Sequence, residues 1–447
     1  MTVTDTLVEF ITAGLPPEPD VLRIVDLCLL DWASVTCAGK DEPVSQLVRN
    51  RAMAEGGTAE AQVCGASQRL PARTSAMVNG VTSHALDYDD THFASLGHPS
   101  VTVIPAVVAL ADRTGASMAE VKQAVLTGAE VAIRLGVWLG RDHYRTGFHV
   151  TGTAGTFGAV AGAAHLLQLT KAQTRMALGV AASLAGGVKA QFGTMAKPMH
   201  AGLAAAAGVD AVLWAQAGLV AAEEGLDAPQ GYAATHHAMR NNNAFDGLGR
   251  HSVLPEISHK FHACCHGTHA MLEALGALRD AHGLTLENVS TVKITVHPQY
   301  LDICNIPEPG TGLEAKFSYR HLAAMMLGGV ATERLESFGD ATQTDPDLSA
   351  FRARVSVRTD TALGETYARV EIERRGGGHL IGEHDLSAPM TFAEREARIL
   401  VKSAALIGAS RSRELWSDIT SFTLDPAGAR RFGKVTGENI GRPFAII

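Results

Sequence analysis

Apolar residues recur every three or four positions along most of the chain up to Ser258, and this spacing is that of one face of an α-helix. Two such runs are Val21, Ile24, Val25, Cys28, Leu29 and Met118, Val121, Ala124, Val125, Ala129, Ile133. Capping boxes mark two helix starts, Ser117-x-x-Glu120 and Thr170-x-x-Gln173. Only 5% of the residues are aromatic, so Ala and Gly must bring the helices close together. The pattern predicts a large all-helical domain over residues 1–258.

The pattern changes near Leu284, where apolar and polar residues begin to alternate as in a half-buried strand. Alternation is seen at Val292, Ile294, Val296, at Val355, Val357 and at Val370, Ile372, with a glycine hairpin at Gly376-Gly377-Gly378 before Leu380. A helical stretch, Ala315 to Leu327, lies between the strands, and helical spacing resumes after Thr391-x-x-Glu394. We therefore expect a mainly α protein with an inserted smaller α+β domain over 259–390. Residues 391–447 should rejoin the helical domain.

One segment is long and uncharged enough to be mistaken for a membrane span. Between His149 and Thr170 there is no acidic or basic residue apart from histidine. The segment consists mostly of Gly, Ala and Thr, and it includes His165 and Gln168, which suit a close-packed helix inside a large protein. We predict a buried helix and no membrane association.

Charge and cysteine content exclude several other classes of protein. The 447 residues have a net charge of −8, which is unfavourable for binding nucleic acid or an anionic membrane. Six scattered cysteines are too few for a disulfide scaffold. The first ten residues contain Asp5 and Glu9 and no basic residue, unlike a secretory signal. A cytoplasmic protein is expected.

The first of four reactive clusters runs from His84 to His98 and has three carboxylates within four residues, Asp87, Asp89 and Asp90. Such a cluster can be a solvated turn at the end of a helix. Alternatively, Asp87-x-Asp89-x-Thr91 matches the phosphatase motif of the haloacid dehalogenases, which requires a buried strand before it. Helical spacing of the preceding residues weighs against that alternative.

Two further clusters place cations next to predicted helix starts. Arg141, His143, Tyr144, Arg145 and His149 precede the uncharged helix, where amides and cations both favour an anion, although an ordinary polar linker would look the same. Lys197 is the only charged residue between Lys189 and Asp210, and Pro198 beside it suits a first helical turn. This lysine either reaches solvent or is desolvated for base or electrostatic work.

The fourth cluster has six metal-capable side chains within eleven residues: His259, His262, Cys264, Cys265, His266 and His269. A zinc site is an alternative here, but the spacing of a closed tetrahedral site is missing, and only Cys265 and His269 share a helix face. We therefore predict no metal and regard Lys260 as the more important side chain of the cluster.

At these clusters the chain closely resembles the MmgE/PrpD family of 2-methylcitrate dehydratases, cis-aconitate decarboxylases and iminodisuccinate epimerases. The matching motifs are Asp87-x-Asp89-Asp90-Thr91 with His98-Pro99, Gly147-Phe148-His149, Lys197-Pro198-x-His200-x-Gly202, Lys260 with Cys265 and His269, and Glu314-Ala-Lys-Phe-Ser318. They occur in order over nearly the whole chain. Relatives that act as decarboxylases or dehydratases often have Tyr two positions after Tyr319, where this chain has His321. The overall pattern is most similar to the iminodisuccinate epimerases.

The resemblance implies a helical domain with a small α+β lid, a homodimer, no cofactor, and a small polycarboxylate substrate. Six residues fall on positions that line the active site of the family: Asp87, Thr91, His98, His149, Lys197 and Lys260. We predict Asp87, His98, Tyr144, His149, Lys197 and Lys260 as catalytic residues and Thr91, Arg145, His269, Tyr319 and His321 as substrate-binding residues. We expect these residues to converge on one site.

The expected chemistry is removal and return of a proton at the carbon next to a carboxylate, with iminodisuccinate as the expected substrate. Lys197, Lys260 and His98 could stabilise the enediolate charge, while His149 or Tyr144 could move the proton. The alternative within the family is a dehydratase or decarboxylase of a small tricarboxylate, of the 2-methylcitrate or cis-aconitate type. Outside the family, a metal-dependent phosphatase and a non-catalytic interaction protein are the alternatives.

Overall fold

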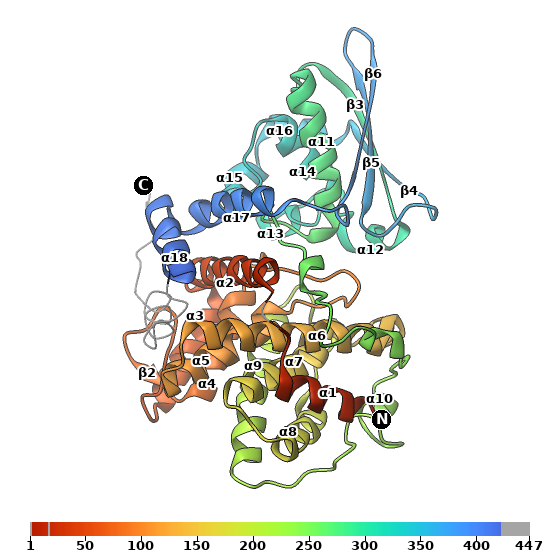
Figure 1. Ribbon diagram of the computed structural model, residues 1–447. Helices are drawn as coiled ribbons and strands as arrows, with labels where there is room; N and C mark the ends of the chain where they lie inside the picture. Colours follow the sequence, from red (N-terminus) through yellow and green to blue (C-terminus); the bar gives the residue numbers. More distant parts are fainter. Residues whose placement is uncertain (1, 17, 422–447) are drawn as a thin grey trace. The chain divides into compact units, whose positions relative to one another are not determined.

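The computed structural model describes residues 2–16 and 18–421, and these residues form two compact units (Figure 1). The first unit comprises the chain up to His259 together with the residues from Ile399 onward, and the second comprises Lys260–Arg398. The fold is mainly helical, as the sequence predicts. Of the C-terminal segment predicted to rejoin the helical domain, residues 422–447 lie outside the described part.

The first unit consists of helices joined by loops and short 3-10 turns. The helices are α1 (Val3–Ala13), α2 (Pro19–Gly39), α3 (Pro43–Glu55), α4 (Ala72–His84), α5 (Ser100–Thr114), α6 (Met118–Thr146), α7 (Val150–Leu166), α8 (Lys171–Leu184), α9 (Ala196–Gln216), α10 (Tyr232–Thr235) and α18 (Ala409–Ser421). The 3-10 turns are η1 (Lys189–Gln191), η2 (Asn242–Phe245) and η3 (Leu254–Glu256). Both predicted capping boxes are present, at the starts of α6 and α8.

The uncharged segment forms the predicted buried helix, α7, in which all residues from Val150 to Ala164 are buried. It packs against α6 and α9, and its glycines allow the backbones to approach closely: a Cβ atom at Gly158 would lie 2.8 Å from the carbonyl oxygen of Gly128. None of the helices in the described residues is both long and apolar enough to cross a membrane.

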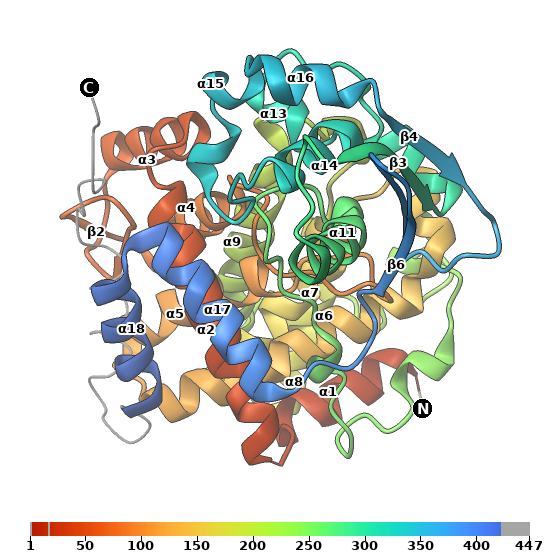
Figure 2. The same cartoon turned by 90° about the horizontal axis from the view of Figure 1, so that it is seen from above.

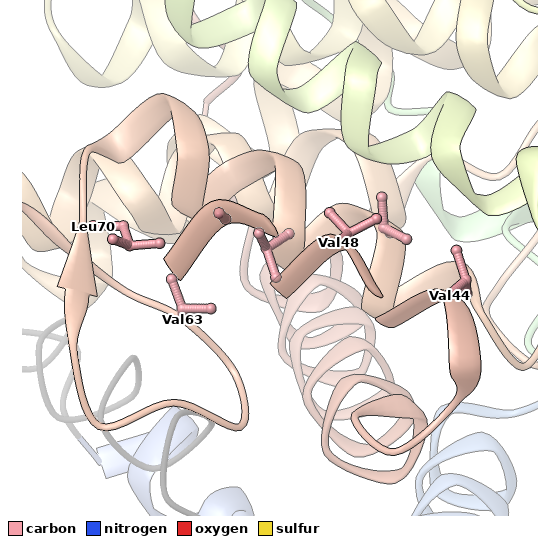
Figure 3. Packing of buried hydrophobic residues seen from close by; sticks show 7 residues of the cluster. Val44, Val48, Val63 and Leu70 are labelled. Carbon is pink, nitrogen blue, oxygen red and sulfur yellow. The ribbon is translucent and has the colours of Figure 1, made fainter. Parts of the chain in front are cut away.

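A two-stranded hairpin interrupts the region predicted to be entirely helical. Its strands β1 (Ala61–Gln62) and β2 (Arg69–Leu70) pair antiparallel. The strands are only two residues long, too short for an alternating pattern to reveal them in the sequence. Figure 3 shows that Val63 and Leu70 pack with Val44 and Val48 of α3 in one apolar cluster. This packing holds the hairpin in place.

The C-terminal helices lie against α2 (Figure 2). Helix α17 (Phe392–Ile407) begins after the predicted cap, where the amide of Glu394 donates to the hydroxyl of Thr391 over 3.3 Å. The ammonium of Lys402 on α17 lies 2.5 Å from a carboxylate oxygen of Asp31 on α2, and both side chains are 1% exposed. A buried pair of opposite charges is costly to separate, so it fixes α17 on α2.

The second unit is built on a four-stranded sheet with the order β4-β3-β5-β6. Its strands are β3 (Val289–Val296), β4 (Val355–Thr359), β5 (Tyr367–Arg374) and β6 (His379–Asp385). Strands β3 and β4 are parallel, and the other neighbours are antiparallel. The antiparallel pairing of β5 with β6 confirms the predicted hairpin. The turn between them needs glycine, since Gly376, Gly377 and Gly378 all have positive φ angles.

Helices accompany the sheet, and α11 packs against β5 and β6 (Figure 1). The helices of this unit are α11 (His269–His282), α12 (Leu301–Cys304), α13 (Gly312–Ala315), α14 (Tyr319–Leu327), α15 (Asp340–Gln343) and α16 (Pro346–Arg352), with the 3-10 turns η4 (His266–Thr268), η5 (Pro298–Tyr300) and η6 (Leu335–Phe338). The helical stretch predicted over Ala315 to Leu327 is confirmed from Tyr319 onward, as α14, whereas Ala315 ends α13. The chain breaks between α13 and α14 because Ser318 is extended and its hydroxyl caps α14 at the amide of His321.

Candidate active site

The loop after α4 separates its three carboxylates by giving each a different partner. Asp87 faces the ammonium of Lys197, Asp89 faces two histidines, and Asp90 accepts hydrogen bonds from Ser100. Asp87 has a φ of 51°, a left-handed conformation that aspartate tolerates better than most residues. Since α4 ends at His84, Asp87 follows a helix rather than the buried strand that the phosphatase alternative requires.

Asp89 is shared by two imidazoles. Nδ1 of His84 lies 2.9 and 3.0 Å from its two carboxylate oxygens, and Nδ1 of His98 lies 2.7 Å from one of them. Burial alone would raise the pKa of Asp89, but the two histidines outweigh it and hold the pKa well below its usual value. Asp89 is therefore ionised near neutral pH, and Nδ1–H of each histidine donates a hydrogen bond to it.

His149 forms the N-cap of α7, where its amide donates to the carbonyl of Gly187 over 3.0 Å. Its Nδ1 lies 2.9 Å from Nδ1 of His200, and its ring is stacked on that of His84 at a centroid distance of 6.0 Å. Burial, followed by the charge of Lys197, lowers the pKa of His149 well below its usual value. A neutral imidazole is therefore expected at this position near pH 7.

Lys197 lies in the first turn of α9, where the sequence predicted it. Its ammonium is 2.6 Å from a carboxylate oxygen of Asp87 and 5.3 Å from the ring centre of Phe192. The side chain is 16% exposed, which fits a cation at the edge of a buried histidine group rather than on an open surface. Asp87, His98, His149 and Lys197 thus come together in the first unit.

Three other predicted residues of the first unit have different surroundings. Tyr144 lies at the end of α6 with the ammonium of Lys189 3.7 Å from its ring centre. The side chain of Arg145 is 71% exposed and pairs with Asp142. The backbone of Thr91 pairs with that of Ser258. Arg145 therefore does not join the histidine group.

Four predicted residues belong to the second unit, and all are buried: Lys260, His269, Tyr319 and His321. Nε2 of His269 lies 3.3 Å from the carbonyl oxygen of Cys264, and the Tyr319 hydroxyl donates to the carbonyl of Gly267 over 2.8 Å. Burial lowers the pKa of His321 to about 4, with a further contribution from the charge of Arg352. Burial also lowers the pKa of His269 well below its usual value.

Two groups of side chains within the described residues could hold a metal ion, and each has its ligand atoms within 4.8 Å of one another. They are His84, Asp87, Asp89, His98 and Cys28, Asp90, His259. In the first group Lys197 and the two imidazoles already compensate the carboxylates, so we assign no metal there. Neither group uses the Cys264 to His269 segment, and the absence of a metal requirement stays a prediction.

Three residues of this cluster, His84, Asp89 and His200, were not among the predicted catalytic or substrate-binding residues. All three occur in the motifs quoted for the family resemblance or next to them. The signal that could have identified them is the spacing across helix ends: His84 ends α4 five residues before Asp89, and His200 lies one turn after Lys197 on α9.

Comparison with protein-family models gives two matches. The model of the MmgE/PrpD N-terminal domain matches residues 6–243, and that of the MmgE/PrpD C-terminal domain matches residues 262–399. The first match alone covers more than half of the chain.

Several characterised proteins are similar in sequence. The cis-aconitate decarboxylase of Homo sapiens is 29% identical over 301 residues, covering 65% of this chain and 62% of the human protein. That of Mus musculus is 30% identical over 304 residues, with 65% and 61% covered, and that of Aspergillus terreus is 28% identical over 335 residues, with 69% and 68% covered. The match spans less than two thirds of the length of the human and mouse proteins.

These names contradict the iminodisuccinate epimerase expected from the sequence, and that expectation is wrong. It relied on the overall pattern and on one departure, His321 in place of Tyr. A single substituted position says little about the reaction when the similarity to decarboxylases extends over 301 residues. The similarity favours the alternative given in the sequence analysis, a lyase acting on a tricarboxylate.

Proposed function

This chain belongs to the MmgE/PrpD family, and on that premise we propose that it is a lyase that decarboxylates a small tricarboxylate of the cis-aconitate type. The observation that supports this proposal best is the match to three proteins named cis-aconitate decarboxylase. The histidine and lysine cluster of the first unit supplies the chemistry that such a reaction needs.

Decarboxylation breaks a carbon–carbon bond and leaves the electron pair on the substrate when carbon dioxide departs. In an unsaturated tricarboxylate the double bond passes this pair to a carbon next to another carboxylate, where enediolate charge develops. A proton then adds to carbon and completes the product. The protein must therefore bind a highly anionic substrate, stabilise the developing charge and deliver one proton.

Lys197 is proposed to stabilise the negative charge, because its ammonium lies in the first turn of α9, where the helix amides add positive potential. Lys260, at the start of the second unit, is a further candidate cation. Asp87, 2.6 Å from the Lys197 ammonium, is proposed to hold that ammonium in place.

His98 is the better proton donor of the two predicted histidines. Its contact with the Asp89 carboxylate favours the charged imidazolium, whereas burial keeps His149 neutral. His149, whose Nδ1 faces Nδ1 of His200, is proposed to donate a hydrogen bond from Nε2–H to a carboxylate of the substrate. Tyr144 remains a candidate for moving the proton, and Thr91, His269, Tyr319 and His321 remain candidates for substrate binding. The exposed Arg145 is not retained.

We also infer a cytoplasmic homodimer from the family resemblance. The six cysteines within the described residues are free thiols, which fits a reducing compartment. The arrangement of the second unit as a lid over the first is likewise a proposal.

The proposed function is tested by incubating the purified full chain with cis-aconitate and following carbon dioxide release and the alkene protons by NMR. We expect stoichiometric loss of one carboxylate at a rate far above that without protein. Loss of water from 2-methylcitrate without decarboxylation of cis-aconitate would instead identify a dehydratase. No turnover of either acid would contradict the proposal.

A further inference from the structure

The imidazole of His84 has a partner at one nitrogen and none at the other. Its Nδ1 faces both carboxylate oxygens of Asp89, at 2.9 and 3.0 Å. Its Nε2 is buried as well, yet it has no hydrogen-bond partner within residues 2–16 and 18–421. Buried polar atoms are nearly always hydrogen-bonded, because leaving one unsatisfied costs its full desolvation. Such an atom inside a proposed active site is typical of a group whose partner is a ligand.

The surroundings of His84 place it among the residues proposed for the reaction. Its ring lies edge-on to that of His98 at 4.7 Å and parallel to that of His149 at 6.0 Å. Ligand atoms of His84, Asp87, Asp89 and His98 all lie within 4.8 Å of one another. A substrate that reaches His98 or His149 would therefore come close to His84 too.

Asp89 decides which nitrogen of His84 is available to a ligand. A carboxylate can only accept, so Nδ1 must carry a proton and the free position is Nε2. A ligand in the site therefore meets Nε2 of a ring whose other nitrogen is held by a buried carboxylate.

We propose that His84 is a further substrate-contacting residue, whose Nε2 contacts the bound substrate while Asp89 fixes the ring. This inference rests on the proposed function for the identity of the substrate. It assigns a ligand contact to a residue that the sequence analysis did not select. Asp89 acts through His84 and His98 and is a positioning residue.

The substitution His84→Asn separates this role from a structural one. The asparagine side-chain amide can replace Nδ1–H toward Asp89, whereas nothing replaces Nε2. We expect kcat/KM for cis-aconitate to fall about 10- to 100-fold, the value of one hydrogen bond to a charged group. His165→Asn is the matched control, since Nδ1 of His165 also bonds a protein oxygen, the Ile11 carbonyl at 2.8 Å, outside the site. Unchanged kcat/KM in a folded His84→Asn variant would overturn the inference.

A binding measurement on the wild-type chain keeps the test independent of turnover. In ¹⁵N-histidine-labelled protein, the Nε2 resonance of His84 is the one that His84→Asn removes. We expect it to shift saturably on addition of tricarballylate, a saturated tricarboxylate without the double bond needed for decarboxylation. A shift without carbon dioxide release from cis-aconitate would uphold this contact and contradict the proposed reaction. Release of carbon dioxide without a shift, or with a shift that His165→Asn abolishes, would overturn the contact alone.

Discussion

Lys197 shows why a single lysine occurs in a stretch of small, uncharged residues. Its ammonium pairs with Asp87 and lies near the ring of Phe192, so the charge is used inside the site rather than for solubility. The sequence predicted the importance of this lysine from its isolation. It could not predict the partner, because Asp87 is 110 residues away and the pairing depends on how α4 packs against α9.

Replacing Lys197 should abolish most of the activity with little effect on folding. Lys197→Met keeps the length of the side chain but removes the charge that stabilises the enediolate, so we expect kcat to fall by about 10²- to 10³-fold. Steady-state decarboxylation kinetics measure the effect. Lys171→Met, which removes an exposed ammonium paired with Glu9, is the control and should leave kcat unchanged. Equal effects of the two substitutions would show that Lys197 has no special role.

Asp90 makes the stability of the fold depend on pH. Burial, together with the charge of Asp31, raises the pKa of Asp90 to about 7 from an ordinary value of 3.8. Between these two values the unfolded chain has lost the proton and the folded chain retains it. Stability from this residue is therefore complete below about pH 4 and is lost as the pH rises to 7, by about 4 kcal/mol at most.

Asp90→Asn should remove that dependence, because an amide does not titrate. We expect the free energy of unfolding in urea to fall less between pH 5 and pH 8 in the variant than in the wild type. Asp20→Asn, at a side chain that is 96% exposed, should leave the wild-type pH dependence in place. Parallel pH profiles for wild type and Asp90→Asn would contradict the assignment.

The other site residues show how far the role of a single residue can be predicted from the sequence. His98, His149 and Lys197 were predicted as site residues because polar side chains among Gly- and Ala-rich helices are costly to bury unless they share partners. No role was predicted for His84, because its pairing with Asp89 depends on the fold of the loop and is not evident from the sequence. Arg145 was selected from its cluster, yet its side chain is mostly exposed.

Among the elements, α6 and α7 depend on glycine at their crossing. A Cβ atom at Gly158 would lie 2.6 Å from Cβ of Ala132 and 2.8 Å from the carbonyl oxygen of Gly128, closer than real Cβ contacts. Gly158→Ala should therefore destabilise the protein by about 1–3 kcal/mol despite the better helix propensity of alanine. Thermal unfolding compares it with Gly364→Ala, whose added Cβ meets nothing within 4 Å and should be nearly neutral. A stability of Gly158→Ala equal to that control would show that the helices can separate freely.

Helix starts and the glycine hairpin could be predicted because each depends on a few neighbouring residues. The capping boxes at Ser117 and Thr170 and the turn at Gly376 are such local features. The strand order β4-β3-β5-β6 could not be predicted, since the parallel pairing of β3 with β4 joins segments separated by the five helices α12 to α16. The β1–β2 hairpin is likewise set by packing against α3 and α4, a contact without a local signal.

On the scale of the whole molecule, the first unit is discontinuous in sequence, because residues from Ile399 onward return to it. The buried pair of Lys402 and Asp31 anchors this return. The ammonium of Lys402 also donates to the backbone carbonyl of Tyr88 over 2.6 Å, within the loop that holds Asp87 and Asp89. Through Lys402, α17 thus contacts the loop that contains Asp87 and Asp89.

We propose that the expected homodimer forms through the region of α8 and α9. Large apolar side chains are exposed between residues 184 and 220: Leu184, Val188, Phe192, Met195, Leu203, Trp214, Leu219 and Val220. Trp214 is 43% exposed and Val220 85%, and large apolar side chains exposed in this way are candidates for a protein–protein interface. Light scattering after gel filtration should therefore give twice the chain mass of 47.0 kDa.

Trp214→Glu should shift the protein toward the monomer, because a buried, unpaired carboxylate is costly at an interface. Leu47→Glu, at a 61% exposed leucine on α3, is the matched control and should remain dimeric. A monomeric wild type, or an unchanged mass for Trp214→Glu, would place the interface elsewhere or remove it.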